Sequence, residues 1–272
     1  MLSLRNRIYG LAIGGIVADS MGAVAAYAPD LQITSPISSL QAGIQPGYWT
    51  EPTGLFLARL ASRGNGIGKV PTCTGVYAEC NLKTLPLLVQ NTPLCIIHED
   101  LSRALGCGQM DDVTKLWLAF MDGVLHGLPK KMLFNHSIYH GLPPNIISLL
   151  DGSGLDLDLD NLTTDGAELD MFREVLQIFR NTNNYIEGLT KVVNECMAPA
   201  WTATIYGQLA GAYYGITDIP ESWMDHIQQS SEILSLLESV SNARLKGVGT
   251  DLGVSAEEKH VSAKPSRNVA TV

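Results

Sequence analysis

The chain has 272 residues, of which 46% are hydrophobic, 17% charged and 7% aromatic. A chain of this length can bury a substantial core, so we expect a globular protein with one main domain. Acidic residues outnumber basic ones by 27 to 18, which gives a formal net charge of -9. Because binding to a phosphate backbone needs a basic patch, and the sequence shows none, we expect no nucleic-acid partner.

The five cysteines are odd in number and form no Cys-x-x-Cys pair. This usage argues against both a disulfide framework and a zinc knuckle. It favours a reducing compartment, so we expect a cytoplasmic protein.

The N-terminus offers secretion as the alternative. Arg5 and Arg7 precede an apolar run over 9–18 and small residues at 23–26, a pattern similar to a signal peptide. Asp19 interrupts that pattern. It also keeps every apolar stretch short of the roughly 20 residues of a membrane span, so we expect a soluble protein without a membrane partner.

The first predicted element is a helix with a ridge of small residues on one face. Gly10, Gly14, Ala18 and Gly22 recur at every fourth position, so they share that face. A second ridge follows late in the chain, and its members are Ala203, Gly207, Gly211 and Gly215. Glycine inside a helix costs about 1 kcal/mol relative to alanine, so two such ridges predict two helices packed closely together. A ligand-site role for the ridges is the alternative.

The remaining apolar periodicity predicts further helices in chain order. They are expected at 53–62, 80–90, 98–107, 110–126, 168–180, 184–195 and 220–242. Clusters of Gly, Pro, Ser and Asp predict loops at 28–49, 63–75, 127–136 and 151–167. Alternation typical of strands is scarce, so we expect an all-α domain over 1–246. Residues 247–272 hold few large apolar side chains, which predicts a disordered tail.

Four local patterns fail the motifs that they suggest. Residues 64–69 look like a phosphate loop, but Arg63 and Val70 stand where that loop needs Gly and Ser or Thr, so we interpret them as the end of a helix. His136 and His140 are spaced to share a helical face, yet no Glu follows His136 as in a zinc protease, so a surface pair is expected. The acidic stretch 151–170 lacks the spacing of an EF-hand, and we expect a solvated loop there. His98 and His126 have no acid or nucleophile near them in the sequence, which leaves no basis for a triad.

Four segments, in the same order, resemble motifs of the ADP-ribosylglycohydrolase family, which includes proteins like dinitrogenase reductase-activating glycohydrolase. Residues 7–22 read RIYGLAIGGIVADSMG and are similar to R-x-x-G-x-x-x-G-x-x-x-G-D-A-x-G. Residues 203–223 read ATIYGQLAGAYYGITDIPESW and are similar to A-A-I-x-G-x-L-x-G-A-x-Y-G with an I-P-x-x-W turn. Between them, 49–53 (WTEPT) precedes a helix, and 82–86 (LKTLP) stands where the family has M-R-x-x-P-L.

The resemblance implies a compact orthogonal helical bundle that cleaves ADP-ribose from a modified side chain or small molecule. It also implies two magnesium ions, whose ligands come from a T-D-D-T stretch and a late D-x-D-T stretch, with an assisting glutamate in the first loop. Such ions are held by carboxylates, and a pair of them can orient a water molecule and stabilise developing charge.

This sequence departs from the implied ligand set. The first stretch corresponds to residues 50–53, where Glu51 and Pro52 replace the two aspartates. The late stretch falls on 198–201, which read APAW, and the first-loop glutamate falls on Ala26. One carboxylate and one hydroxyl do not hold a magnesium pair, so we expect no metal and no cofactor, although the family uses magnesium.

These replacements suggest a degenerate member, a pseudoenzyme that acts by binding or as a structural subunit. Its expected partner is ADP-ribose or an ADP-ribosylated protein. No catalytic residue is expected, and Glu51 and Asp19 are vestigial candidates. The candidate ligand-binding residues are Thr50, Glu51, Glu79, Lys83 and Trp201.

Two alternatives stay open. One is an active hydrolase with a rearranged site that uses Glu51, Glu79 or Asp19. The other is a general helical scaffold whose cleft is closed.

Overall fold

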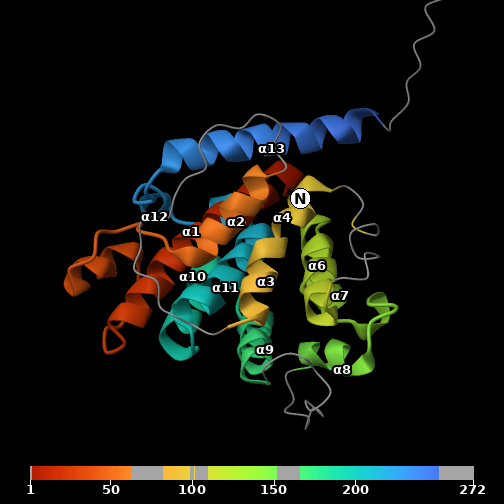
Figure 1. Cartoon of the computed structure of the whole chain (residues 1–272), viewed down its shortest axis with the longest axis horizontal. Coiled ribbons are helices and arrows are strands. Elements are labelled where there is room, and N and C mark those ends of the chain that lie inside the picture. Colours follow the sequence, from red (N-terminus) through yellow and green to blue (C-terminus); the bar gives the residue numbers. More distant parts are fainter. Residues whose placement is uncertain (1, 63–81, 99–100, 102–109, 152–165, 251–272) are drawn as a thin grey trace, which may run out of the picture.

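The computed structural model describes residues 2–62, 82–98, 101, 110–151 and 166–250. Every regular element within these residues is a helix, which confirms the predicted all-α class (Figure 1). The predicted helix 98–107 and the loop 63–75 fall almost wholly outside the described residues, as does most of the loop 151–167.

The centre of the bundle is a pair of helices, α1 (Leu4–Tyr27) and α11 (Pro199–Tyr214). A Cβ atom built on Gly10 would lie 2.0 Å from the carbonyl oxygen of Gly211, and one on Gly211 would lie 2.0 Å from that of Gly10. At the other end of the pair, a Cβ on Gly22 would meet the carbonyl oxygen of Pro199 at 2.2 Å. The helices therefore run antiparallel with their backbones in contact, and the packing predicted from the two ridges is confirmed.

Helices α9 (Gly166–Asn181) and α10 (Tyr185–Glu195) pack against α11. The layer on another side holds α2 (Glu51–Ala61), α3 (Thr84–Asn91) and α6 (Asp112–Leu125), and α13 (Ser230–Thr250) crosses one end of the bundle against α1, α2 and α4 (Pro93–Ile97) (Figure 1). The apolar period that predicted a helix over 110–126 forms a buried stripe on α6, whose members are Val113, Leu116, Trp117, Phe120, Met121 and Val124. One hydrophobic core thus joins segments from both halves of the chain.

Helix α1 is long and apolar enough to cross a membrane by length and composition, with a mean hydropathy of 1.5 in its most apolar window. The expectation that Asp19 would exclude such a stretch is therefore wrong. Within the fold, however, 89% of that window is buried, and Asp19 itself is fully enclosed by protein. A helix that other helices surround on all sides needs apolar residues around its whole circumference, and this explains the high hydropathy of α1.

The predicted helix 220–242 is wrong as one element. It is divided into α12 (Glu221–Met224) and α13, and Gln229 stands between them with a positive φ of 58°. An α-helix does not continue through that backbone conformation. Helix α13 also runs past the expected domain boundary at 246 to Thr250, and the rest of the predicted tail lies outside the described residues.

Two predicted loops contain short helices. The 3₁₀-helix η1 (Pro36–Ala42) lies in the loop 28–49, and α7 (Lys130–Leu133) lies in the loop 127–136. These turns are too short to show an apolar period, so pattern analysis does not find them.

The histidine pair is not helical. His136 begins a 3₁₀ turn, and its Nε2 lies 2.8 Å from Oδ1 of Asp151. His140 lies beyond that turn, so the two side chains do not share a helical face. Both are exposed, which confirms their expected surface position.

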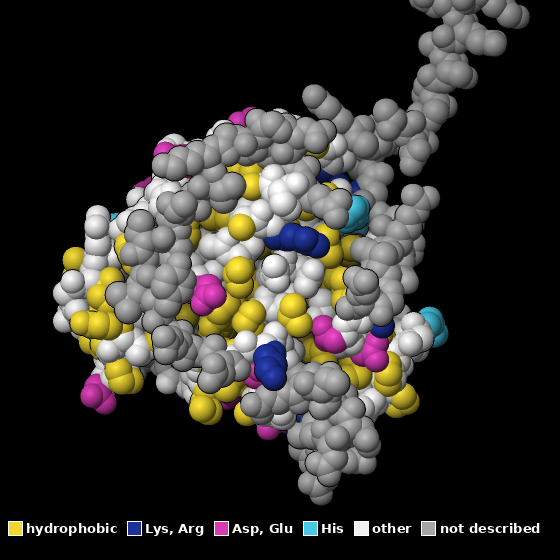
Figure 2. Space-filling view, in the orientation of Figure 1, with side chains coloured by type: hydrophobic (Ala, Val, Ile, Leu, Met, Phe, Trp, Pro, Cys, Tyr) yellow, Lys and Arg dark blue, Asp and Glu magenta, His cyan; other side chains and the backbone are white. Residues whose placement is uncertain are grey.

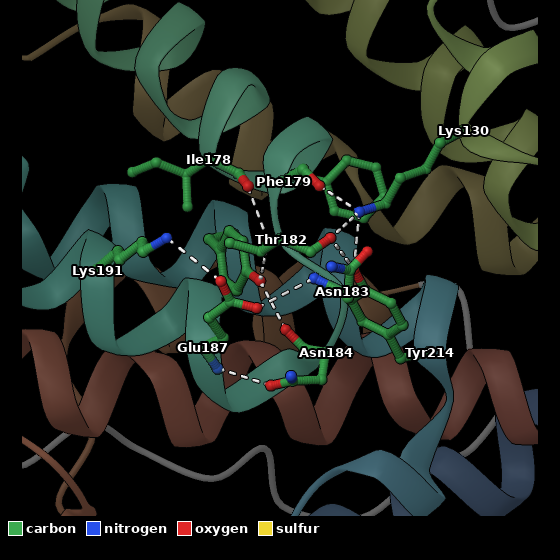
Figure 3. A network of polar contacts seen from close by, with 10 residues as sticks. Lys130, Ile178, Phe179, Thr182, Asn183, Asn184, Glu187, Lys191 and Tyr214 are labelled. Atoms are coloured by element: carbon green, nitrogen blue, oxygen red, sulfur yellow. Dashed lines mark hydrogen bonds and ion pairs between the residues drawn. The ribbon is translucent and has the colours of Figure 1, made fainter.

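A polar network ties α7 to the junction of α9 and α10 (Figure 3). The ammonium of Lys130 donates to the carbonyl oxygens of Phe179 and Thr182, and to the hydroxyl of Tyr214 at 2.7 Å. It also lies 4.3 Å from the centre of the Phe179 ring. Burial lowers the pKa of Lys130 to about 8, although Glu187 opposes the shift. All three ammonium donors of Lys130 therefore have partners. This side chain holds α7 against the end of α9 and has no donor free for chemistry.

Candidate functional site

A cavity of about 400 Å³ lies where α1, α2 and α11 meet. The last two turns of α1 and the segment before α2 form one part of its wall, and the first residues of α2 and α11 form the other. The lining residues are Ser20, Ala23, Val24, Ala26, Tyr27, Ile44, Tyr48, Thr50, Glu51, Pro52, Ala198, Pro199, Ala200 and Trp201. Two helix N-termini that are far apart in the sequence therefore open on the same space.

Hydrophobic side chains are exposed next to this cavity. Tyr27 of the wall is 67% exposed, and Met197, directly before α11, is 69% exposed. In Figure 2 hydrophobic side chains also gather at the left edge, where Figure 1 places the segment between α1 and α2, which includes the exposed Ile37 and Leu40. Exposed apolar side chains therefore lie on the cavity wall and in the chain segments that contribute to it.

Asp19 of α1 fixes the start of α2. Its Oδ2 accepts hydrogen bonds from the backbone N–H groups of Thr50 at 2.8 Å and Thr53 at 3.1 Å, and its Oδ1 accepts from the Thr50 hydroxyl at 2.6 Å. The first N–H groups of a helix have no partner inside the helix, so a carboxylate from another helix can cap them. Burial raises the pKa of Asp19, and the bonds from Thr50 and Thr53 oppose this shift. Asp19 lies behind the wall and does not line the cavity.

Ala198 begins α11 in a strained backbone conformation. Its φ of 48° and ψ of 54° lie in the left-handed region, and its carbonyl oxygen accepts from the N–H groups of Trp201 and Thr202. Among non-glycine residues, Asn and Asp adopt this conformation most readily. This backbone conformation is therefore more typical of Asn or Asp than of the alanine that stands at position 198.

We expect Ala198→Gly to raise the free energy of unfolding by about 0.5–1 kcal/mol, because it removes the steric cost of a left-handed alanine. Ala200→Gly, two residues further inside the same helix turn, is the matched control and is expected to lower it by a similar amount. Urea unfolding measures both values. Destabilisation by both variants would contradict the strain at Ala198.

The cavity wall offers little to a metal ion. Glu51 is the only acidic side chain among its described residues, and the Thr50 hydroxyl already donates to Asp19. No group of three or more His, Cys, Asp or Glu side chains that could hold a metal ion occurs anywhere in the described residues. Magnesium takes about six oxygen ligands, usually including carboxylates, so the residues present do not fit a pair of such ions.

The structure brings three of the five candidate ligand-binding residues together: Thr50, Glu51 and Trp201 all line the cavity. Lys83 is not among the lining residues. It is exposed at the start of α3, and its backbone N–H donates to Oε1 of Glu168 at 2.7 Å. Glu79 lies outside the described residues.

Glu168 has a structural role, as a helix cap, that the sequence analysis did not predict. Its buried carboxylate accepts from the N–H groups of Lys83, Thr84 and Leu85, and so caps α3 as Asp19 caps α2. The expectation of a solvated acidic stretch over 151–170 is therefore wrong at this residue. Nothing local in the sequence distinguishes Glu168 from an exposed acidic residue such as Asp170, because the partners of Glu168 are more than 80 residues away.

Comparisons with known proteins agree with this architecture. The family model described as ADP-ribosylglycohydrolase matches residues 156–248, which include α9 to α11 and most of α13. A solved structure, an ADP-ribosylglycohydrolase-related protein complex, superposes on the chain with a TM-score of 0.69, 20% sequence identity, and coverage of 90% of this chain and 100% of that one. This chain thus resembles the ADP-ribosylglycohydrolase family.

Among curated proteins, the ADP-ribosylarginine hydrolase Tri1 of Serratia proteamaculans (strain 568) is 24% identical over 140 residues. That match covers 51% of this chain and 38% of the hydrolase, so it spans well under half of the relative's length. The resemblance inferred from the four sequence segments is thus confirmed for the family and its fold. One of those segments, 49–53, meets the stretch 198–201 at the cavity, and that stretch lies just before the late segment 203–223.

Proposed function

We propose that this member of the ADP-ribosylglycohydrolase family is non-catalytic and acts by binding a ligand or partner at the cavity. One observation carries the proposal. The two helix starts that the resemblance identifies as metal-binding segments do face one cavity, and together they present a single carboxylate to it, that of Glu51.

The chemistry of the family explains why this observation matters. Two metal ions supply the charge that orients a water molecule and stabilises the transition state. Pro52 and the alanines at 198 and 200 have no side-chain oxygen, so that contribution is lost at three lining positions. Trp201 adds an indole to the same wall, and an indole packs well in a cavity that no longer holds hydrated ions.

We expect no turnover of ADP-ribosyl-arginine, ADP-ribosyl-serine or O-acetyl-ADP-ribose above the buffer rate. We also expect millimolar magnesium to leave the melting temperature unchanged, because a ligand stabilises a protein only when its concentration approaches Kd. Product chromatography and differential scanning fluorimetry measure these two quantities. Turnover by the unmodified protein that disappears in Glu51→Gln would overturn the proposal, and so would a magnesium-dependent rise of several degrees.

A gain-of-function triple variant sharpens the test. Pro52→Asp, Ala198→Asp and Ala200→Asp would add three carboxylates to the cavity wall, and the left-handed backbone at 198 tolerates aspartate. We expect this variant to acquire a magnesium-dependent melting temperature that the unmodified chain lacks. Its failure to do so while folded would show that Trp201 fills the space of the ions.

An active hydrolase with a rearranged site is the second candidate, because the curated relative is named as a hydrolase. The residues available to it are Glu51 and Asp19, since Glu79 lies outside the described part of the chain. The oxygens of Asp19 already accept three hydrogen bonds behind the cavity wall, which leaves Glu51 as the one carboxylate of the described lining that can reach a substrate.

ADP-ribose and an ADP-ribosylated protein remain the partners that family membership suggests for this chain. A cytoplasmic location likewise remains our proposal. The residues that are similar to a signal peptide form the buried central helix α1 in this fold.

A further inference from the structure

The two stretches of chain that build the cavity carry no basic side chain. Residues 8–58 and 192–222 contain no Lys, Arg or His, and every described lining residue comes from one of these stretches. The same stretches carry six acidic side chains, which are Asp19, Asp30, Glu51, Glu195, Asp218 and Glu221. Among the described lining residues Glu51 is the one charged side chain, so a pyrophosphate group would find no cationic side chain in this part of the wall.

The lining combines the two features that favour an organic cation. Tyr27, Tyr48 and Trp201 place three aromatic side chains on the wall, and Glu51 adds a carboxylate. Aromatic faces attract ammonium groups through the ring quadrupole, and this attraction grows when the cation leaves water. An apolar wall with one opposite charge also suits an alkylated cation better than a strongly hydrated metal ion.

The helix N-termini that open on the cavity do not reverse this preference. Helix dipoles favour anions, but the effect depends on N–H groups free to meet the ligand. Asp19 already accepts the N–H groups of Thr50 and Thr53 at the start of α2. Pro52 and Pro199, at the start of α2 and α11, have no N–H group at all. Little of the usual anion site remains at either helix.

We propose that the cavity between α1, α2 and α11 binds an organic cation of the alkylated ammonium class, with Glu51 as its counter-charge and the aromatic side chains against its alkyl groups. This inference rests on the proposed function only in treating the cavity as a metal-free binding site. The ligand class follows from the charge and composition of the wall.

Isothermal titration calorimetry with choline and with its neutral isostere 3,3-dimethylbutan-1-ol tests the role of charge. We expect choline to bind at least about tenfold more tightly than the isostere, because only the cation gains from Glu51 and the rings. Glu51→Gln is expected to remove this preference while leaving weak binding of the isostere. Glu238→Gln, at an exposed carboxylate on α13, is the matched control and is expected to bind choline as the unmodified protein does.

Tyr27 tests the aromatic contribution with little risk to folding, because its side chain is largely exposed. We expect Tyr27→Leu to weaken choline binding several-fold, whereas Tyr27→Phe preserves it. Equal binding of choline and the isostere would overturn the proposal, as would unchanged choline binding by Glu51→Gln. Tighter binding of ADP-ribose than of choline, in a protein that still shows no hydrolysis, would also overturn it while leaving the non-catalytic function standing.

Discussion

Replacing Gly211 with alanine is expected to lower the free energy of unfolding by about 3 kcal/mol or more, at the upper end of the usual cost of overpacking. The added Cβ atom would lie 2.0 Å from the carbonyl oxygen of Gly10. A backbone oxygen cannot rotate away as a side chain can, so α1 and α11 must move apart along their whole contact. Gly10→Ala is expected to have the same effect, because the approach is reciprocal.

Gly123→Ala in α6 provides the matched control. It is also a buried glycine inside a helix, but its new Cβ would meet only the ends of the Leu133 and Leu128 side chains, at 2.9 Å and 3.1 Å. Those ends can shift, and alanine favours the helix by about 1 kcal/mol, so we expect little net change in stability. Urea unfolding of the three variants gives the comparison. A cost below 1 kcal/mol for Gly211→Ala would contradict the close antiparallel contact.

Asp19→Ala is expected to destabilise the protein by about 3–5 kcal/mol, because two backbone N–H groups and one hydroxyl would lose their acceptor in a buried place. The start of α2 would lose its cap, and Glu51 would lose its fixed position beside the cavity. Asp19→Asn keeps one oxygen acceptor and is expected to cost less. Asp170→Ala removes an exposed carboxylate that pairs with Arg173, and we expect a change within about 0.5 kcal/mol.

The raised pKa of Asp19 gives these variants a pH signature. Because the folded state holds this proton more tightly than the unfolded chain does, the associated stability is present in full below the unfolded pKa of about 3.9. It is lost as the pH rises through the folded pKa. Asparagine does not titrate, so the stability of the unmodified protein relative to Asp19→Asn is expected to decline as the pH rises above the unfolded pKa of aspartate. A difference that grows with pH would mean that the hydrogen bonds to the charged carboxylate outweigh its burial.

The sequence alone was sufficient for the elements with a long period and for the central pair of helices. Small residues at every fourth position identify a helix face that a neighbouring backbone must approach, and the pair α1 and α11 satisfies this in an antiparallel arrangement. The stripe on α6 is equally local, because one apolar face of a helix needs only its own 3.6-residue period to be recognised. Where an element has seven residues or fewer, as in α4, α7 and η1, the apolar period is too short to detect.

The sequence predicted the candidate site only in part. Its residue types at 50–53 and 198–201 were evident from motif order, including the absence of the expected carboxylates. These segments meet at one cavity because of how α2 and α11 pack against α1. The same packing leaves Lys83 outside the cavity wall. The carboxylates of Asp19 and Glu168 cap helices that start 31 to 85 residues away in the chain.

The sequence by itself therefore determined most of the longer helices, the buried faces of α1, α6 and α11 and the chemical groups that the site lacks, because these depend on residue type and on spacing within one helix. Only the tertiary structure decided which acidic side chains are structural caps and which one, Glu51, faces the cavity. The physical reason is that a buried carboxylate is stable only where donors from other segments converge on it, and no local pattern records that convergence.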